Sequence, residues 1–256
     1  MWTPALGRFV KKRGKKMLIG RILFTLSVIL VILFFVFLII AIVRLIKKKT
    51  AKKYFLISIV SLFACFLSFY LGITIPEQAY QDDCDVVRLQ HLNYYGNLIE
   101  EYKLKVGKYP FEGEEQQVYA FIYNNNQKEY CEDTNPYSHI QKTPKEFFSE
   151  LEKGLGRKVD QLFDPQYVPS GRPIFYIYMI DGNQYFFAVH LSKKFPFSKK
   201  VASKYYKTEI SNIPDEEYQF YKIEELEKNE DFKKATSKNF GGYFELRKKQ
   251  HIHEYE

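Results

Sequence analysis

The chain opens with two long apolar runs before it changes to a mixed polar and apolar pattern. The first run is 22 uncharged residues between Arg21 and Arg44, and the second is 23 residues from Tyr54 to Pro76. Each run matches the roughly 20 apolar residues that cross a ~30 Å hydrocarbon core as a helix. Two runs in tandem exceed the apolar region of a signal peptide, and no small-residue cleavage site follows the first. The pattern predicts two membrane-spanning helices.

Residues 82–106 have the periodicity of an amphipathic helix. Their apolar side chains recur at spacings of three and four, which puts them on one face. This face consists of Val86, Leu89, Leu92, Tyr95, Ile99, Tyr102 and Val106. Gly107 followed by Pro110 is a helix stop signal. The face must be buried, and we expect its partner to be a sheet built from later residues.

Later segments supply that sheet. The runs "RPIFYIYMI" and "QYFFAVHLS" flank an Asp-Gly turn, which predicts a β-hairpin. "SKYYKTEI" and "EYQFYKIEEL" are expected to add strands, the latter entering a helix, whereas "EEQQVYAFIY" fits a strand or a short helix. A short helix is predicted from Thr143 as N-cap, through Glu146 in a capping box, to Gly154 at its end. The predicted class is α+β, a long helix on a small antiparallel sheet.

These elements divide the chain into four parts. Residues 1–20 form a basic tail, and residues 21–76 form the two-helix membrane region with a basic linker at 44–53. An α+β domain follows over residues 77–245. Residues 246–256 form a charged C-terminal tail.

The net charge of +8 is concentrated at the N-terminus. Residues 1–53 hold 13 Lys and Arg and no acid, leaving 25 Lys and Arg against 30 Asp and Glu for the remainder. Basic residues beside apolar helices set topology and meet anionic lipid headgroups. The charge therefore indicates membrane lipid as a partner and argues against nucleic acid.

The same charges predict the orientation. The linker has six Lys and Arg, and the segment after the second helix has none before Arg88, so the linker is expected in the cytoplasm and the domain outside. The basic N-terminal tail also favours the cytoplasm, but two spanning helices cannot keep both the tail and the linker on that side. We expect either that Met17 is the true start or that the first helix inserts incompletely.

Candidate chemistry is sparse. Cys84 and Cys131 are the only cysteines outside the apolar runs, and they pair without ambiguity in an oxidising compartment or remain two thiols in a reducing one. The five histidines form no ligand pattern, and no nucleophile elbow, zinc motif or phosphate-binding loop occurs. The expectation is a non-enzymatic protein with no catalytic residue, cofactor or metal.

Several segments in order resemble type IV pilins and type II secretion pseudopilins. Pro76 falls 21 residues after Phe55, the spacing of the pilin helix, and "GITIPEQAYQD" is similar to its continuation. Gly107, Tyr109 and Pro110 lie in "GKYP", which resembles the family's closing motif, and "FDPQYVPSGRPIFYIYMIDGNQYFFAV" resembles its strand region. The resemblance implies a pilin-like fold over residues 52–110 and 163–191.

Two departures from that family qualify the resemblance. Tyr54 stands where the family has the glycine after which its peptidase cuts, and Ile59 stands where it has the glutamate used in assembly. The resemblance, with these departures, implies a permanently anchored, diverged or accessory relative of secretion or pilus systems. It implies a place in the bacterial inner membrane, with envelope or secretion-system proteins as partners. Two alternatives stay open, an extracytoplasmic ligand-binding or sensor module and a membrane-tethered enzyme.

Overall fold

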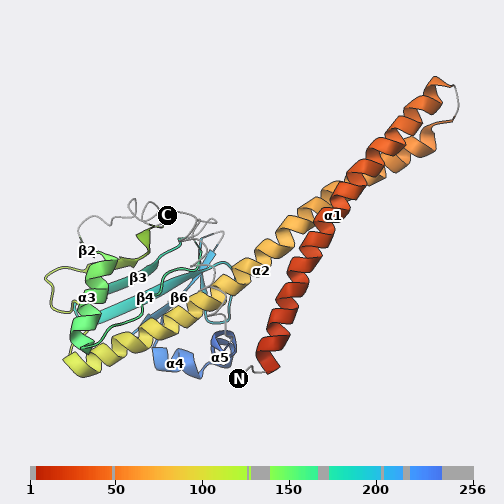
Figure 1. The fold of residues 1–256 in the computed structure, drawn as a ribbon. Coiled ribbons are helices and arrows are strands. Elements are labelled where there is room, and N and C mark those ends of the chain that lie inside the picture. Colours follow the sequence, from red (N-terminus) through yellow and green to blue (C-terminus); the bar gives the residue numbers. More distant parts are fainter. Residues whose placement is uncertain are drawn as a thin grey trace. The chain divides into compact units, whose positions relative to one another are not determined.

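The structure is a computed structural model that describes residues 4–47, 50–125, 127, 139–166, 173–202, 205–215 and 220–237. The chain forms two compact units, residues 1–81 and 82–256. The first is helical, and the second combines helices with a sheet, so the chain is α+β (Figure 1). Helix α2 (Lys52–Val106) contributes residues to both units.

The first unit contains helix α1 (Pro4–Ile46) and the beginning of α2. Both predicted apolar runs are helical, and both helices are long and apolar enough to cross a membrane. Helix α1 already begins at Pro4, so the basic segment before Arg21 belongs to the same helix as the first apolar run. Pro76 lies inside α2.

Small side chains occupy the contact between α1 and α2. The buried ones are Ser27, Ala41, Ser58, Ser61, Cys65 and Ser68. The large apolar side chains point outward instead, with Ile59 62% and Phe63 73% exposed. The two helices approach closely at Gly20, where an added Cβ would overlap the Pro76 side chain. Small residues inside and large apolar residues outside is the packing typical of helices in lipid.

The second unit is built on a seven-stranded sheet in the order β2-β1-β3-β4-β6-β5, with β7 also paired to β6. The strands are β1 (Val118–Ile122), β2 (Ile140–Lys142), β3 (Tyr176–Asp181), β4 (Gln184–Leu191), β5 (Lys199–Ala202), β6 (Tyr205–Ser211) and β7 (Phe220–Tyr221). The predicted hairpin is confirmed as β3 and β4, joined through Gly182 at φ 56°. Such a left-handed conformation suits glycine.

The prediction of an antiparallel sheet is wrong in one respect, because the sheet is mixed. β1 pairs with β2 in parallel, and β6 pairs with β7 in parallel. A parallel pair needs a longer connection than a hairpin turn. The connection after β1 spans residues 123–139, long enough for the chain to return in the same direction.

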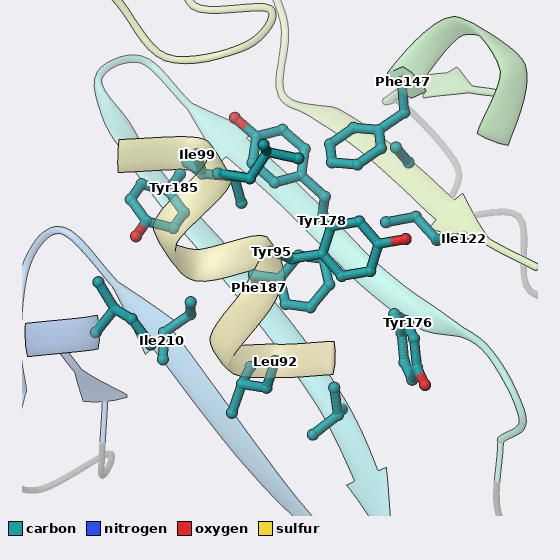
Figure 2. Packing of buried hydrophobic residues seen from close by; sticks show 14 of the residues in the cluster. Leu92, Tyr95, Ile99, Ile122, Phe147, Tyr176, Tyr178, Tyr185, Phe187 and Ile210 are labelled. Carbon is teal, nitrogen blue, oxygen red and sulfur yellow. The ribbon is translucent and has the colours of Figure 1, made fainter. Parts of the chain in front are cut away.

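One face of the sheet packs against the helices and forms the main core. A row of paired residues crosses four strands, namely Ala120, Tyr178, Phe187 and Ile210. Tyr95 of α2 is fully buried over this row, and its ring centroid lies 5.1 Å from that of Phe187 (Figure 2). The predicted apolar face of α2 is confirmed from Val86 to Tyr102, but Val106 is 37% exposed because it is the last helical residue.

Helix α3 (Pro144–Leu155) begins as predicted. The Thr143 hydroxyl accepts from the Glu146 N–H, and the Glu146 carboxylate accepts from the Thr143 N–H, which completes the capping box. The predicted end at Gly154 is wrong, because the cap is Gly156 at φ 64°. Gly154 serves close packing, since an added Cβ there would overlap the Tyr102 ring.

Two short helices complete the described fold. Helix α4 (Ile223–Lys228) follows β7, as the sequence predicted, and α5 (Glu230–Thr236) was not predicted. Asn229 starts α5, and its side chain accepts from the N–H groups of Asp231 and Phe232. Both helices bury apolar residues in the main core, Ile223, Leu226, Phe232 and Ala235.

Gly154→Ala tests this packing. Inside an ordinary helix the change stabilises by roughly 0.5–1 kcal/mol. Here the added methyl group overlaps the buried Tyr102 ring, so the free energy of unfolding should fall by about 1–3 kcal/mol. Urea unfolding of the full chain in detergent measures it. A Tyr102→Ala background should abolish the loss, and an unchanged loss there would contradict the packing.

Candidate functional site

Arg88 on α2 is a charged residue that is fully buried in the second unit, with its side chain 0% exposed. Its Nε donates to Asp164 Oδ2 at 2.7 Å, and its Nη2 donates to Asp164 Oδ1 at 2.9 Å. Nη1 donates to Asp85 Oδ1 at 2.7 Å, and Nη2 also donates to Gln166 Oε1 at 3.0 Å. The guanidinium thus binds one carboxylate through two nitrogens and a second through a third. We name Asp85, Arg88, Asp164 and Gln166 the arginine centre.

Asp85 connects this centre to the end of β4. Its Oδ1 and Oδ2 accept from the Ser192 N–H at 2.9 and 3.0 Å, and Oδ2 accepts from the Lys193 N–H at 3.1 Å. These two N–H groups directly follow the strand. Asp85 and Arg88 are one helical turn apart, so the spacing of three aims both side chains the same way.

Residues 160–166, which we name the strap, have no regular secondary structure and are held by side chains. Tyr94 Oη accepts from the Asp160 N–H at 2.9 Å. Tyr95 Oη accepts from the Leu162 N–H at 2.8 Å and donates to the Leu162 carbonyl at 2.6 Å. Side chains of α2 therefore satisfy backbone groups of the strap that a ladder would otherwise satisfy.

Gln127 holds the end of the strap from the segment after β1. It is 0% exposed, and its Nε2 donates to the carbonyls of Asp164 at 3.1 Å and Gln166 at 2.8 Å. Its Oε1 accepts from the Asn124 N–H at 3.0 Å. The arginine centre and its neighbours thus join four parts of the chain: α2, the strap, the segment after β1 and the end of β4.

The charges of the centre depend on one another. Burial acts to lower the pKa of Arg88, but the neighbouring charges of Asp164 and Asp85 outweigh it and raise that pKa, so the guanidinium stays protonated. Burial raises the pKa of Asp85 and of Asp164, and the Arg88 charge opposes the rise. Each charge is therefore stable in the interior only while its partner is present.

Two histidines lie near this centre. His91 Nδ1 is 2.7 Å from Tyr176 Oη, and burial followed by the Arg88 charge lowers the pKa of His91 to about 3. His190 on β4 is 5% exposed and packs against the rings of Phe175 and Tyr205. Burial lowers the pKa of His190 to about 4. Both imidazoles are therefore neutral at pH 7.

This arrangement stabilises the fold rather than offering a surface to a ligand. Four of the five guanidinium N–H groups point at partners within the protein, and both ion-pair partners of Arg88 are at most 1% exposed. Among the described residues, no group of three or more His, Cys, Asp or Glu could hold a metal ion.

The residues that carry the pilin resemblance lie in different places. Phe55 and Pro76 belong to the apolar part of α2. Gly107, at φ 85°, ends α2, and the next turn attaches to the sheet. The Tyr109 ring lies 4.7 Å from the Tyr185 ring between centroids, and the Pro110 carbonyl accepts from Tyr178 Oη at 2.8 Å. The "GKYP" turn thus positions the end of α2 against the β3–β4 hairpin.

The predicted disulfide remains a prediction. Cys84 on α2 is 0% exposed, and its electrostatic interaction with Arg88 contributes to the raised pKa of Arg88. Cys131 lies outside the described residues.

Sequence reasoning missed the arginine centre. Asp85 and Arg88 at a spacing of three within an apolar face were a usable signal, because charges on such a face are rarely buried unless paired. The partner Asp164 lies 76 positions later, and nothing local to it indicates burial.

Comparisons with known proteins add no relative. No protein-family model, curated protein or solved structure matches the chain.

Arg88→Met tests the centre. The change leaves two buried carboxylates without their cation, so the free energy of unfolding should fall by about 3–5 kcal/mol. Arg157→Met is the matched control. Its pair with Glu101 is about half exposed, so the cost there should stay below about 1 kcal/mol. Urea unfolding of the full chain in detergent measures both, and equal losses would contradict a special role for Arg88.

The low pKa values of His91 and His190 predict acid sensitivity. Their folded pKa values lie below the ordinary 6.5, so the unfolded chain binds protons first as the pH falls. Stability should be complete above about pH 6.5 and decline toward pH 4.5, by up to about 1.4 kcal/mol per pH unit for each histidine.

Urea unfolding between pH 8 and 4.5 measures this decline. His190→Phe should make the free energy of unfolding depend less steeply on pH. The lost hydrogen bond to Phe175 lowers that free energy by the same amount at every pH, so it does not change the slope. An unchanged slope in that variant would show that His190 is not involved.

Proposed function

We propose that the protein is a non-enzymatic, membrane-anchored envelope protein whose second unit is a pilin-like domain outside the inner membrane. In this proposal it is an accessory or diverged component related to type II secretion or type IV pilus systems. The two helices of the first unit hold it permanently in the bilayer. Other envelope or secretion-system proteins are its partners.

The packing of the first unit is the observation that carries the anchoring. Leu56, Ile59 and Phe63 are each more than 60% exposed. Exposure of these large apolar side chains to water would be energetically unfavourable. In lipid the cost disappears. The buried hydroxyls also fit lipid, because Ser58 donates to the Tyr54 carbonyl of its own helix and leaves no unsatisfied group.

The shared helix supports the pilin-like part of the proposal. Helix α2 runs for 55 residues from its apolar half to its buried half, and the second half packs on a sheet. A membrane helix that continues into the core of an α+β domain is the organisation that the Phe55–Pro76 spacing and the "GKYP" turn suggested. Tyr54 and Ile59 argue for retention in the membrane without cleavage or assembly.

Membrane extraction and topology reporters test the proposal. The full chain should stay in the membrane at alkaline pH and leave it only with detergent. A reporter after Thr50 should be cytoplasmic, and one after Glu256 should be exported, because the linker is strongly basic.

A complementary pair of reporters, one active only inside and one only outside, provides the control at each site. A cytoplasmic C-terminus would refute the exported domain. A mature chain beginning at Phe55 would refute permanent anchoring.

A further inference from the structure

The turn between α1 and α2 forms an open apolar groove. Leu45 of α1 and Lys52, Phe55, Leu56 and Ile59 of α2 are among the residues that line it. Its volume is about 490 Å³, which falls in the range of roughly 300–1,000 Å³ typical of ligand sites. All of these residues belong to the first unit.

The charge beside this groove is entirely positive. Lys52 lines it, and the exposed Lys47 and Lys53 lie within two residues of lining positions in the chain. Residues 1–76 contain no acid, and the first carboxylate is Glu77, 18 residues beyond Ile59. On the same helix that separation is about 27 Å, close to the thickness of a hydrocarbon core. Neither α1 nor the apolar half of α2 therefore carries a carboxylate near these lysines.

A basic and an aromatic side chain beside the groove are typical of the level of the lipid headgroups. The Arg44 guanidinium lies 4.5 Å from the centre of the Tyr54 ring. Tyrosine and basic side chains at the end of an apolar helix are typical of the membrane interface. The groove thus begins at headgroup level and continues along apolar side chains.

We propose that the groove binds an anionic phospholipid, with an acyl chain against Leu56 and Ile59 and the phosphate beside Lys52. This rests on the proposed function, since it requires the two helices to lie in a bilayer. A zwitterionic lipid offers the same acyl chain without the net charge, so it gains less from the lysines. The groove supplies shape, and the lysines supply selectivity for the anionic headgroup.

Native mass spectrometry of the full chain in mild non-ionic detergent tests the site, with phosphatidylglycerol or phosphatidylcholine added at equal concentration. The chain should retain phosphatidylglycerol and lose phosphatidylcholine. Lys47→Gln with Lys52→Gln should weaken retention of phosphatidylglycerol about 10- to 30-fold. Lys228→Gln with Lys234→Gln removes the same charge from exposed positions on α4 and α5, and should have no effect.

A second pair of variants separates the groove from diffuse attraction. Leu56→Trp fills the groove without changing the charge, and it should abolish retention of phosphatidylglycerol. Phe66→Trp, at a position 66% exposed but outside the groove lining, should not. Equal retention of both lipids, or retention unchanged by Leu56→Trp, would overturn the lipid site. Release of the chain at alkaline pH would instead refute the membrane anchor itself.

Discussion

The second unit depends on the neutralisation of one buried charge. A guanidinium with no exposure to water is tolerated only when its hydrogen bonds and its charge are satisfied inside the protein. Asp85, Asp164 and Gln166 satisfy Arg88, and they can do so only if α2 and the strap are in register. Because Asp85 also accepts the first N–H groups after β4, the same centre fixes the sheet against the helix.

The strap shows why this centre matters for the fold. It has no hydrogen-bonded ladder of its own, so its position comes from the side chains of α2 and Gln127. Tyr95 combines two roles, because its ring packs on Phe187 while its hydroxyl binds the Leu162 backbone. The aromatic core and the polar centre are therefore two sides of one contact between α2 and the rest of the domain.

Helix α2 follows two packing rules along its length. In its first half the small residues Ser58, Ser61 and Cys65 are buried and the large apolar residues face outward. In its second half the large residues Leu92, Tyr95 and Ile99 are buried. The first pattern is typical of helices that pack in lipid, and the second is typical of a helix whose apolar face is buried away from water.

Several elements could be predicted correctly from the sequence because each depends on residues only a few positions apart. They are the apolar helices, the face of α2 from Val86 to Tyr102, the β3–β4 hairpin and the Thr143 capping box. The sequence by itself also determined the uneven charge and the anchor-like hydropathy. Only the tertiary structure decided that β1 pairs with β2 and β6 with β7 in parallel, that Gly154 lies against Tyr102, and that Arg88 binds Asp164. These contacts join residues far apart in the chain, and their energies exist only once the helix, strap and sheet are assembled.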